Sequence, residues 1–282
     1  MCALRARANA ATLASLRRFS RRPRHRECRI PAGRNVGSMK GRYVMKIQGS
    51  VALVTGSNRG LGKALVSALL EAGAAKVYAA ARDVTKVSSD DPRVVPLELD
   101  TSKPEQIAAA ARAAGDVTLL VNNAGVSTSA NVLTASQAAM ETDFRTNVFG
   151  TLAVVKGFLP VLERAPGGAT IVNVLSLASL GSFPALGGYS ASKAASHSVT
   201  QALRPELRGK HIEILAAFPG PIDTDMVKDL PIPKTSPADV ASAVLAGVAR
   251  GEEDIFPDPM AQQMGALFSK SPKEYERAFG GM

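Results

Sequence analysis

The sequence predicts an α/β fold, a doubly wound parallel sheet of about seven strands flanked by helices, in a single domain. The main observation is that short β-branched runs alternate with alanine-rich helical stretches from Val51 onward. This alternation is typical of a parallel sheet that helices cover on both faces. The chain of 282 residues is also 46% apolar, which is enough for one large core. No internal repeat or low-complexity linker divides it.

The predicted elements follow from these runs in chain order. The strands are expected over residues 51–55, 76–80, 94–99, 117–121, 170–175, 212–217 and 254–256. The helices are expected over residues 60–72, 104–114, 137–163, 189–208 and 237–250.

Two of the predicted helices carry local signals. The helix over 60–72 has apolar residues spaced as on a face that packs on a core, at Leu61, Ala64, Leu65, Ala68 and Leu69. Pro205 lies inside the helix over 189–208. Because proline cannot donate a hydrogen bond to the carbonyl of Gln201, we expect a kink or an early end there.

The net charge of +10 belongs to the first 44 residues. They contain eleven arginines, one lysine and a single acid, Glu27, whereas 22 basic and 23 acidic residues follow them. The segment lacks the apolar periodicity of the body, so we expect a disordered basic extension over 1–44 and a folded domain over 45–282. The extension is interpreted as the product of a start codon assigned too early, since Met45 directly precedes the first strand, as a mitochondrial transit peptide, or as an interaction arm.

The composition of the body excludes several classes of protein. A nucleic-acid binder would carry basic charge on its folded surface, and the body is nearly neutral. No run of about 18 apolar residues occurs, so no membrane span is expected. Both cysteines, Cys2 and Cys28, lie in the extension, which fits a reducing compartment. We therefore expect a cytoplasmic protein, or a mitochondrial one if residues 1–44 are a transit peptide.

A glycine-rich turn follows the first predicted strand. Glycines would let backbone N–H groups approach a pyrophosphate, and the N-terminus of the next helix would add its positive end. The spacing is not that of the Gly-x-Gly-x-x-Gly fingerprint, and such turns also arise from packing alone. The turn predicts a dinucleotide site formed by Gly56, Ser57, Asn58, Arg59, Gly60, Leu61 and Gly62.

Two later segments fall at the carboxyl edge of the predicted sheet, where a doubly wound fold binds its ligand. Asn123, Ala124 and Gly125 follow the fourth strand, with a plain turn as the alternative. Asp100 ends the third strand, with Thr101 beside it. It could accept a hydrogen bond from an adenine amino group, or it could be a turn or N-cap carboxylate.

Tyr189 and Lys193 are the candidate chemical groups. Positions four apart lie on one face of a helix, so an ammonium group can stand beside a phenol and favour its ionised form. An unperturbed tyrosine pKa is about 10, and acid–base work near pH 7 requires a drop of roughly three units. We therefore expect Lys193 to lower the pKa of Tyr189.

In combination, these motifs resemble the short-chain dehydrogenase/reductase family, from about residue 46 to residue 259. The motifs are Thr-Gly-x3-Gly-x-Gly at 55–62, Asn-Asn-Ala-Gly at 122–125, Asn147, Ser176, Tyr-x3-Lys at 189–193 and Pro-Gly at 219–220. The resemblance implies a Rossmann-type fold, a nicotinamide dinucleotide and hydride transfer between a carbonyl and an alcohol carbon. It also implies a homodimer or homotetramer formed through the helices over 137–163 and 189–208.

The resemblance also implies a role for each catalytic candidate. Tyr189 would pass the proton, Ser176 would bind the substrate oxygen with Ser179 as its local competitor, and Lys193 would also hold the nicotinamide ribose. Asn147 resembles the asparagine whose backbone helps hold a water between the lysine and solvent. Its alternative is a helix-interior amide with a local bond. The loop that closes over the nicotinamide carboxamide would include Pro219, Gly220, Ile222 and Thr224.

The charges near the adenosine ribose favour NADP(H) over NAD(H). Arg82 closes the second predicted strand and Arg59 lies in the glycine turn, so two guanidinium groups could bind a 2′-phosphate. Both could also be ordinary solvated charges. A shift of one residue would instead put the carboxylate of Asp83 at the ribose, as in an NAD site.

The predicted protein is an NADP(H)-dependent oxidoreductase that interconverts a ketone or aldehyde and an alcohol. Compact or varied carbonyl compounds are expected as substrates, and a steroid or a fatty-acyl carrier substrate stays open as an alternative. No metal is expected, because no cluster of His, Asp, Glu and Cys has ligand spacing. His197 and His211 are expected in packing or at the surface. Residues 126–133, residues 179–188 and the stretch directly after Pro219 would line the substrate cleft. An NAD-dependent alcohol dehydrogenase and a dinucleotide-sensing protein without turnover stay open as alternatives.

Overall fold

A seven-stranded parallel sheet organises the residues that the computed structural model describes, which are 44–128, 130–228 and 231–281. The strands are β1 (Val51–Thr55), β2 (Lys76–Ala81), β3 (Val94–Glu98), β4 (Leu119–Asn122), β5 (Ala169–Val174), β6 (Ile212–Ala217) and β7 (Asp254–Ile255). Their order in the sheet is β3-β2-β1-β4-β5-β6-β7. The winding reverses between β1 and β4, so the predicted doubly wound sheet is confirmed, and this reversal is where such folds bind ligands.

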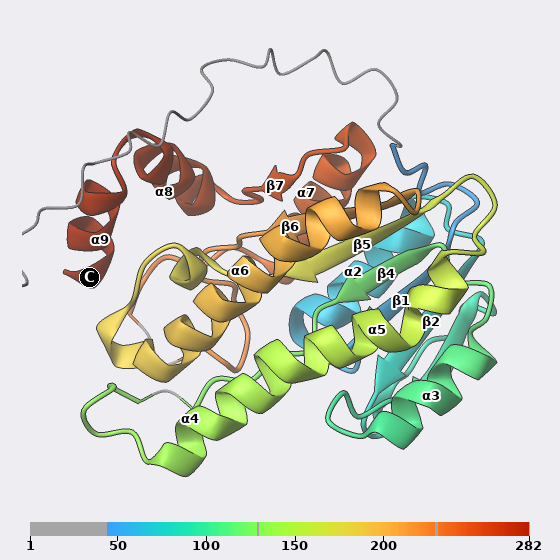
Figure 1. Cartoon of the computed structure of the whole chain (residues 1–282), viewed down its shortest axis with the longest axis horizontal. Coiled ribbons are helices and arrows are strands. Elements are labelled where there is room, and N and C mark those ends of the chain that lie inside the picture. Colours follow the sequence, from blue (N-terminus) through green and yellow to red (C-terminus); the bar gives the residue numbers. More distant parts are fainter. Residues whose placement is uncertain (1–43, 129, 229–230, 282) are drawn as a thin grey trace, which may run out of the picture. The chain divides into compact units, whose positions relative to one another are not determined.

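Helices cover both faces of the sheet (Figure 1). One face packs against α2 (Gly60–Glu71) and α7 (Pro237–Arg250), the other against α3 (Pro104–Ala113), α5 (Thr151–Leu162) and α6 (Gly187–Arg208). An apolar core lies on each face of the sheet, because successive side chains of a strand point to opposite faces. In β1, Ala52 and Val54 belong to the first core and Leu53 to the second.

The apolar stripe predicted for the first helix faces the core as expected. Leu61, Leu65, Ala68 and Leu69 are buried, and Ala64 packs beside them. Met45 is also buried in this core, with 4% of its surface exposed. The predicted basic extension, apart from Val44, lies outside the described residues.

Two helix predictions need correction. The single helix predicted over 137–163 consists of α4 (Gln137–Phe144), a π-helical turn (Arg145–Gly150) and α5. Such turns insert one residue into a helix and often occur at functional sites. Of the kink or early end predicted at Pro205, the early end does not occur, because α6 continues to Arg208. Pro205 and Gln201 are both exposed, so water can bond the carbonyl that the proline leaves free.

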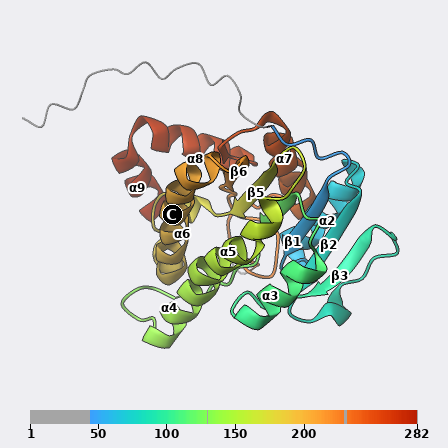
Figure 2. The ribbon, with the colours of Figure 1, turned by 45° about the vertical axis from the view of Figure 1, so that its right-hand side comes forward.

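Two C-terminal helices, α8 (Pro259–Lys270) and α9 (Pro272–Gly280), were not predicted. Both views place them on the β6 and β7 side of the sheet, away from β3 (Figure 2). Their start signals are present in the sequence, since Asp258 and Ser271 are N-cap residues that precede a proline. None of the described helices combines the length and apolar character needed to cross a bilayer.

Candidate active site

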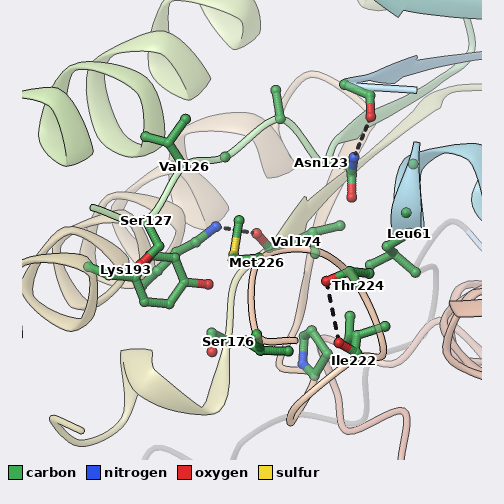
Figure 3. A pocket seen from close by; sticks show the side chains of 18 of the residues that line it. Leu61, Asn123, Val126, Ser127, Val174, Ser176, Lys193, Ile222, Thr224 and Met226 are labelled. Carbon is green, nitrogen blue, oxygen red and sulfur yellow. Dashed lines mark hydrogen bonds between the residues drawn. The ribbon is translucent and has the colours of Figure 1, made fainter. Parts of the chain in front are cut away.

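A cavity of about 730 Å³ opens at the carboxyl ends of β1, β4, β5 and β6. It brings together all but two of the site residues that the sequence predicted. These lining residues are Gly56, Asn58, Arg59, Gly60, Leu61, Gly62, Arg82, Asp100, Thr101, Asn123, Ala124, Gly125, Ser176, Tyr189, Lys193, Pro219, Gly220, Ile222 and Thr224. Figure 3 shows several of them converging from different segments of the chain. The two predicted residues that do not line the cavity are Ser57 and Asn147.

The glycine turn has a backbone that other residues would strain. Gly56 and Gly60 have φ values of +67° and +52°, in the left-handed region that glycine adopts without cost. At Gly62, a Cβ atom would lie 2.1 Å from the carbonyl oxygen of Gly56, far inside van der Waals contact. The N-cap residue Arg59 makes no side-chain hydrogen bond to the first turn of α2, so this helix end faces the cavity without a side-chain cap. The turn therefore fits a bound pyrophosphate.

Asn123 ties the glycine turn to the segment after β4. Its Nδ2 donates to the carbonyl oxygen of Thr55 at 2.9 Å. The Oγ1 of Thr55 accepts in return from the backbone N–H groups of Asn123 and Ala124, each at 3.0 Å. Ser57 also holds the turn, because its Oγ donates to the carbonyl of Ala80 in β2 at 3.1 Å. Ser57 thus supports the turn from behind and does not face the cavity.

The charges where the cavity meets the end of β2 fit an NADP(H) site. Arg82 and Arg59 both line the cavity, and Arg59 also pairs with Asp225 at 3.0 Å. Asp83 accepts hydrogen bonds from the backbone N–H and the hydroxyl of Thr85, which lower the pKa of its carboxyl, and it does not line the cavity. The Asp83 carboxylate, which at the ribose would have indicated an NAD site, is therefore bound to Thr85 in the turn that follows it.

Asp100 makes the turn contacts that the sequence left open as an alternative. Its Oδ1 accepts from the backbone N–H and the hydroxyl of Ser102, at 2.9 and 2.7 Å. Burial opposes its charge, but these bonds and the nearby Arg82 lower the pKa of Asp100 overall. Because Asp100 also lines the cavity, contact with an adenine stays a prediction.

Of the two candidate serines, Ser176 lines the cavity and its competitor Ser179 does not. Ser176 begins the 3₁₀ turn η4 (Leu177–Ser179), where its Oγ accepts from the backbone N–H of Ala178 at 3.1 Å. The Oγ of Ser179 accepts from the backbone N–H of Ser176 at 3.2 Å. This capping box holds Ser176 in place, and the Ser176 side chain acts to lower the pKa of Tyr189.

Tyr189 and Lys193 lie together, and burial shifts the pKa values of both side chains. Burial raises the pKa of Tyr189 to about 12, against the lowering effect of the Ser176 hydrogen bond. Burial also lowers the pKa of Lys193 to about 8. Its Nζ lies 5.8 Å from the tyrosine ring centroid and donates to the carbonyl of Val174 at 2.9 Å (Figure 3). The net shift of the Tyr189 pKa is therefore upward, because desolvation outweighs the Ser176 hydrogen bond, and the predicted effect of Lys193 on the tyrosine stays a prediction.

Asn147 does not line the cavity but holds a segment that does, through hydrogen bonds to Val126. It lies in the π-helical turn with 1% of its surface exposed. Its amide exchanges two hydrogen bonds of 2.9 Å with the backbone of Val126, and Nδ2 also donates to Ser192 Oγ at 2.8 Å. Its own carbonyl accepts from the hydroxyl of Ser196 at 2.9 Å. The predicted contact of this carbonyl with a water remains a prediction.

The loop after β6 is anchored by an aspartate that the sequence analysis missed. Asp258 Oδ2 accepts from the backbone N–H of Gly220 at 2.8 Å, and its Oδ1 caps α8 at Ala261. A Cβ at Gly220 would lie 2.8 Å from the Asp258 carboxylate. Met260 and Phe279, from α8 and α9, line the cavity and were missed as well. The Asp-Pro and Ser-Pro cap signals could have revealed the helices, but not their position.

The two histidines lie where the sequence placed them. His197 packs edge-on against Phe218 with ring centroids 5.0 Å apart, and burial lowers its pKa. His211 is exposed in the turn before β6, with a φ of 55°. Neither lines the cavity.

The raised pKa of Tyr189 predicts how each reaction direction would respond to pH. In the reaction that the resemblance implies, reduction would use the protonated phenol, which is the form present at neutral pH, whereas oxidation would use the phenolate. With the pKa near 12, oxidation should therefore accelerate by about tenfold per pH unit through the neutral range. Reduction should stay constant there and fall only as the phenol ionises. Initial rates in both directions across pH check this, and an oxidation rate that does not change with pH would contradict it.

The sheet topology, the glycine turn and the Ser-Tyr-Lys set define the class of α/β proteins that bind dinucleotides at the strand-order reversal. The model of the short chain dehydrogenase family matches residues 50–234, more than half of the chain. The chain therefore belongs to the short-chain dehydrogenase/reductase family of oxidoreductases.

Several known proteins are similar to this chain. An NADPH-dependent 1-acyldihydroxyacetone phosphate reductase of Saccharomyces cerevisiae is 36% identical over 66% of the chain, and the match spans 65% of that reductase. A short chain dehydrogenase from Burkholderia cenocepacia, solved in complex with NADP, is 39% identical with a TM-score of 0.79, covering 83% of this chain and 99% of that one. A relative from Burkholderia phymatum, solved in complex with NAD, is 26% identical with a TM-score of 0.70, covering 81% and 96%.

Proposed function

We propose that this protein is an NADP(H)-dependent oxidoreductase that reduces a ketone or aldehyde to an alcohol and catalyses the reverse oxidation. The observation that carries the proposal is that Ser176, Tyr189 and Lys193 line the same cavity as the glycine turn. A proton donor and a dinucleotide cradle in one cavity are what hydride transfer to a carbonyl requires.

Each of these side chains has a defined task in the proposed reaction. When bound, the nicotinamide would supply the hydride in reduction and accept it in oxidation. Tyr189 and Ser176 would donate hydrogen bonds to the substrate oxygen, and Tyr189 would give its proton as the carbonyl becomes an alcohol. Lys193, only 5% exposed, would hold ribose hydroxyls from its position beside Val174. Asn147 would keep the loop at Val126 in place.

The preference for NADP(H) is supported by charge and by similarity. Arg59 and Arg82 line the cavity, and the carboxylate of Asp83 is turned to Thr85. The yeast relative is named as NADPH-dependent and one of the similar structures holds NADP. The relative that holds NAD keeps an NAD-dependent alcohol dehydrogenase as the second candidate.

Replacing Arg82 by alanine is expected to weaken NADPH binding by about tenfold to a hundredfold and to leave NADH binding nearly unchanged. A charge-assisted hydrogen bond contributes about 1.5–3 kcal/mol, and only NADPH carries the phosphate that would accept it. Fluorescence titration with both nucleotides measures the effect. Arg112→Ala is the matched control, because Arg112 is exposed on α3 and does not line the cavity. An equal loss for NADH and NADPH would contradict the assignment of Arg82.

The first experiment on the proposed function is NADPH binding, followed by NADPH oxidation with a panel of ketones and aldehydes. Binding with turnover supports an oxidoreductase. Binding without turnover on any carbonyl would favour the dinucleotide-sensing alternative. If neither nucleotide binds, the interpretation of Gly56–Gly62 as a cradle fails.

We also propose that residues 45–282 form the catalytic domain and that it assembles as a homodimer or homotetramer. Phe149, on the π-helical turn between α4 and α5, is a large apolar side chain that is 63% exposed on the helices expected to form the contact. Light scattering of the protein and of Phe149→Ser tests the assembly. A monomer in both cases would contradict it.

A further inference from the structure

The C-terminal helices close one side of the cavity. The family match ends at residue 234, whereas α8 begins at Pro259. Met260 at the start of α8 and Phe279 at the end of α9 both line the cavity. Part of the cavity wall is therefore supplied by a segment that lies outside the matched region.

This segment is fixed in place by an aromatic cluster. Tyr275 is fully buried and stacks on Phe279, with ring centroids 5.2 Å apart. Phe279 meets Phe183 edge-on at 6.0 Å, and Phe268 meets Tyr275 edge-on at 5.5 Å. A Cβ at Gly181 would lie 2.6 Å from the Tyr275 ring, so the chain there passes directly over it. Close-packed rings of this kind hold their neighbours in one arrangement.

Two hydrogen bonds, one buried and one partly buried, connect the same segment to both parts of the reacting site. The hydroxyl of Tyr275 donates to the carbonyl of Leu177, next to Ser176, at 2.6 Å. Asp258, just before α8, accepts from the backbone N–H of Gly220 in the loop after β6. The position of Phe279 is therefore defined relative to the serine that would bind the substrate oxygen.

The wall that results is apolar. The lining residues from η4, η5 (Pro184–Leu186) and its N-cap, α8 and α9 are Leu177, Ala178, Phe183, Leu186, Met260 and Phe279. None of their side chains has a hydrogen-bond donor, a strong acceptor or a charge, and Phe279 is only 8% exposed. A polar or charged substituent against this wall would lose its water without gaining a partner, which is unfavourable.

We propose that Phe279 and Met260 determine the substrate of this enzyme, and that the group they accept beside the reacting carbon is an apolar alkyl or aryl group. The inference rests on the proposed function, because the wall faces the site where Ser176 and Tyr189 would hold the carbonyl oxygen. It names the substrate class that the proposed function leaves open. Phe279 and Met260 bind substrate here and do not take part in proton or hydride transfer.

The test uses the full chain with methyl ketones of increasing alkyl length, phenyl ketones, and hydroxylated ketones of similar size. The unaltered protein should prefer the apolar ketones through a lower KM. Phe279→Ala should raise kcat/KM for the bulkiest ketones and lower it for the smallest by about tenfold. The substitution removes one aromatic ring from the wall and so enlarges the cavity. Met260→Ala is the second enlarging variant, and Phe279→Leu is a milder one if alanine prevents folding.

Phe268→Ala is the matched control, since Phe268 touches Tyr275 in the same cluster without lining the cavity. It should alter thermal stability but leave the order of ketone preference unchanged. Equal changes for all ketones in Phe279→Ala and Phe268→Ala would overturn the inference, as would a preference for hydroxylated ketones. NADPH binding in each variant shows that the nucleotide site is intact.

A readout without turnover separates this inference from the proposed function. Ligand-detected NMR with butanone and a phenyl ketone measures binding to the protein directly. Loss of phenyl ketone contact in the wall variants, with no NADPH oxidation by any carbonyl, would defeat the proposed function and retain the apolar wall. Turnover with the same ketone preference in the wall variants as in the unaltered protein would support the proposed function and overturn the inference about the wall.

Discussion

Replacing Tyr189 by phenylalanine is expected to lower kcat for carbonyl reduction by about a thousandfold, while the affinity for NADPH changes little. The change removes only the hydroxyl that would give its proton to the substrate oxygen. The ring stays in place beside Lys193 and in contact with the cluster around Leu177. Single-turnover rates measure the loss, and nucleotide fluorescence measures the binding.

Tyr78→Phe provides the control for this prediction. Tyr78 donates through its hydroxyl to Asp116 at 2.9 Å and does not line the cavity. The same chemical change there should affect stability and leave the rate within about twofold, as for a site without transition-state contacts. Full activity in Tyr189→Phe would refute its role as the proton donor.

Gly62→Ala is expected to abolish measurable dinucleotide binding and to lower the free energy of unfolding by about 1–3 kcal/mol. The added Cβ would lie 2.1 Å from the carbonyl oxygen of Gly56 and 2.6 Å from Nδ2 of Asn123. Because neither a backbone carbonyl nor a hydrogen-bonded amide can yield that distance, the whole turn must move. Titration with NADPH and thermal unfolding measure the two effects.

Gly209→Ala is the matched control, because Gly209 has no atom within 4 Å of its Cβ position and a φ of −70°. That variant should bind NADPH normally and unfold like the unaltered protein. Normal binding in Gly62→Ala would show that the turn adapts, and the interpretation of this segment as a rigid phosphate cradle would be wrong.

The sequence predicted the sheet well because its signals are local. Each of the seven strands was located to within about two residues, since buried parallel strands are short apolar runs. The amphipathic stripe of α2 was found in the same way. The one continuous helix predicted over 137–163 was wrong for a local reason as well. The π-helical turn between α4 and α5 adds one residue to a helix, and no composition signal marks it.

Site residues with a strict spacing were found, and those defined by packing were not. The glycine turn, Ser176 and the Tyr189–Lys193 pair stand in motifs whose geometry requires those residue types. Met260, Phe279 and Asp258 reach the cavity only because helices after residue 258 fold back onto the turn at Leu177. Ser57 lay in the right motif but supports the turn from behind.

The sequence by itself determined the family, the order of the strands along the chain and the groups able to carry out the chemistry, because periodicity and spacing are properties of neighbouring residues. The tertiary structure alone decided which serine faces the cavity, where Asp83 points and how burial sets the pKa values of Tyr189 and Lys193. It also decided that apolar residues of the C-terminal helices form part of one side of the cavity. These properties depend on contacts between residues far apart in the chain, and desolvation exists only once those residues are packed.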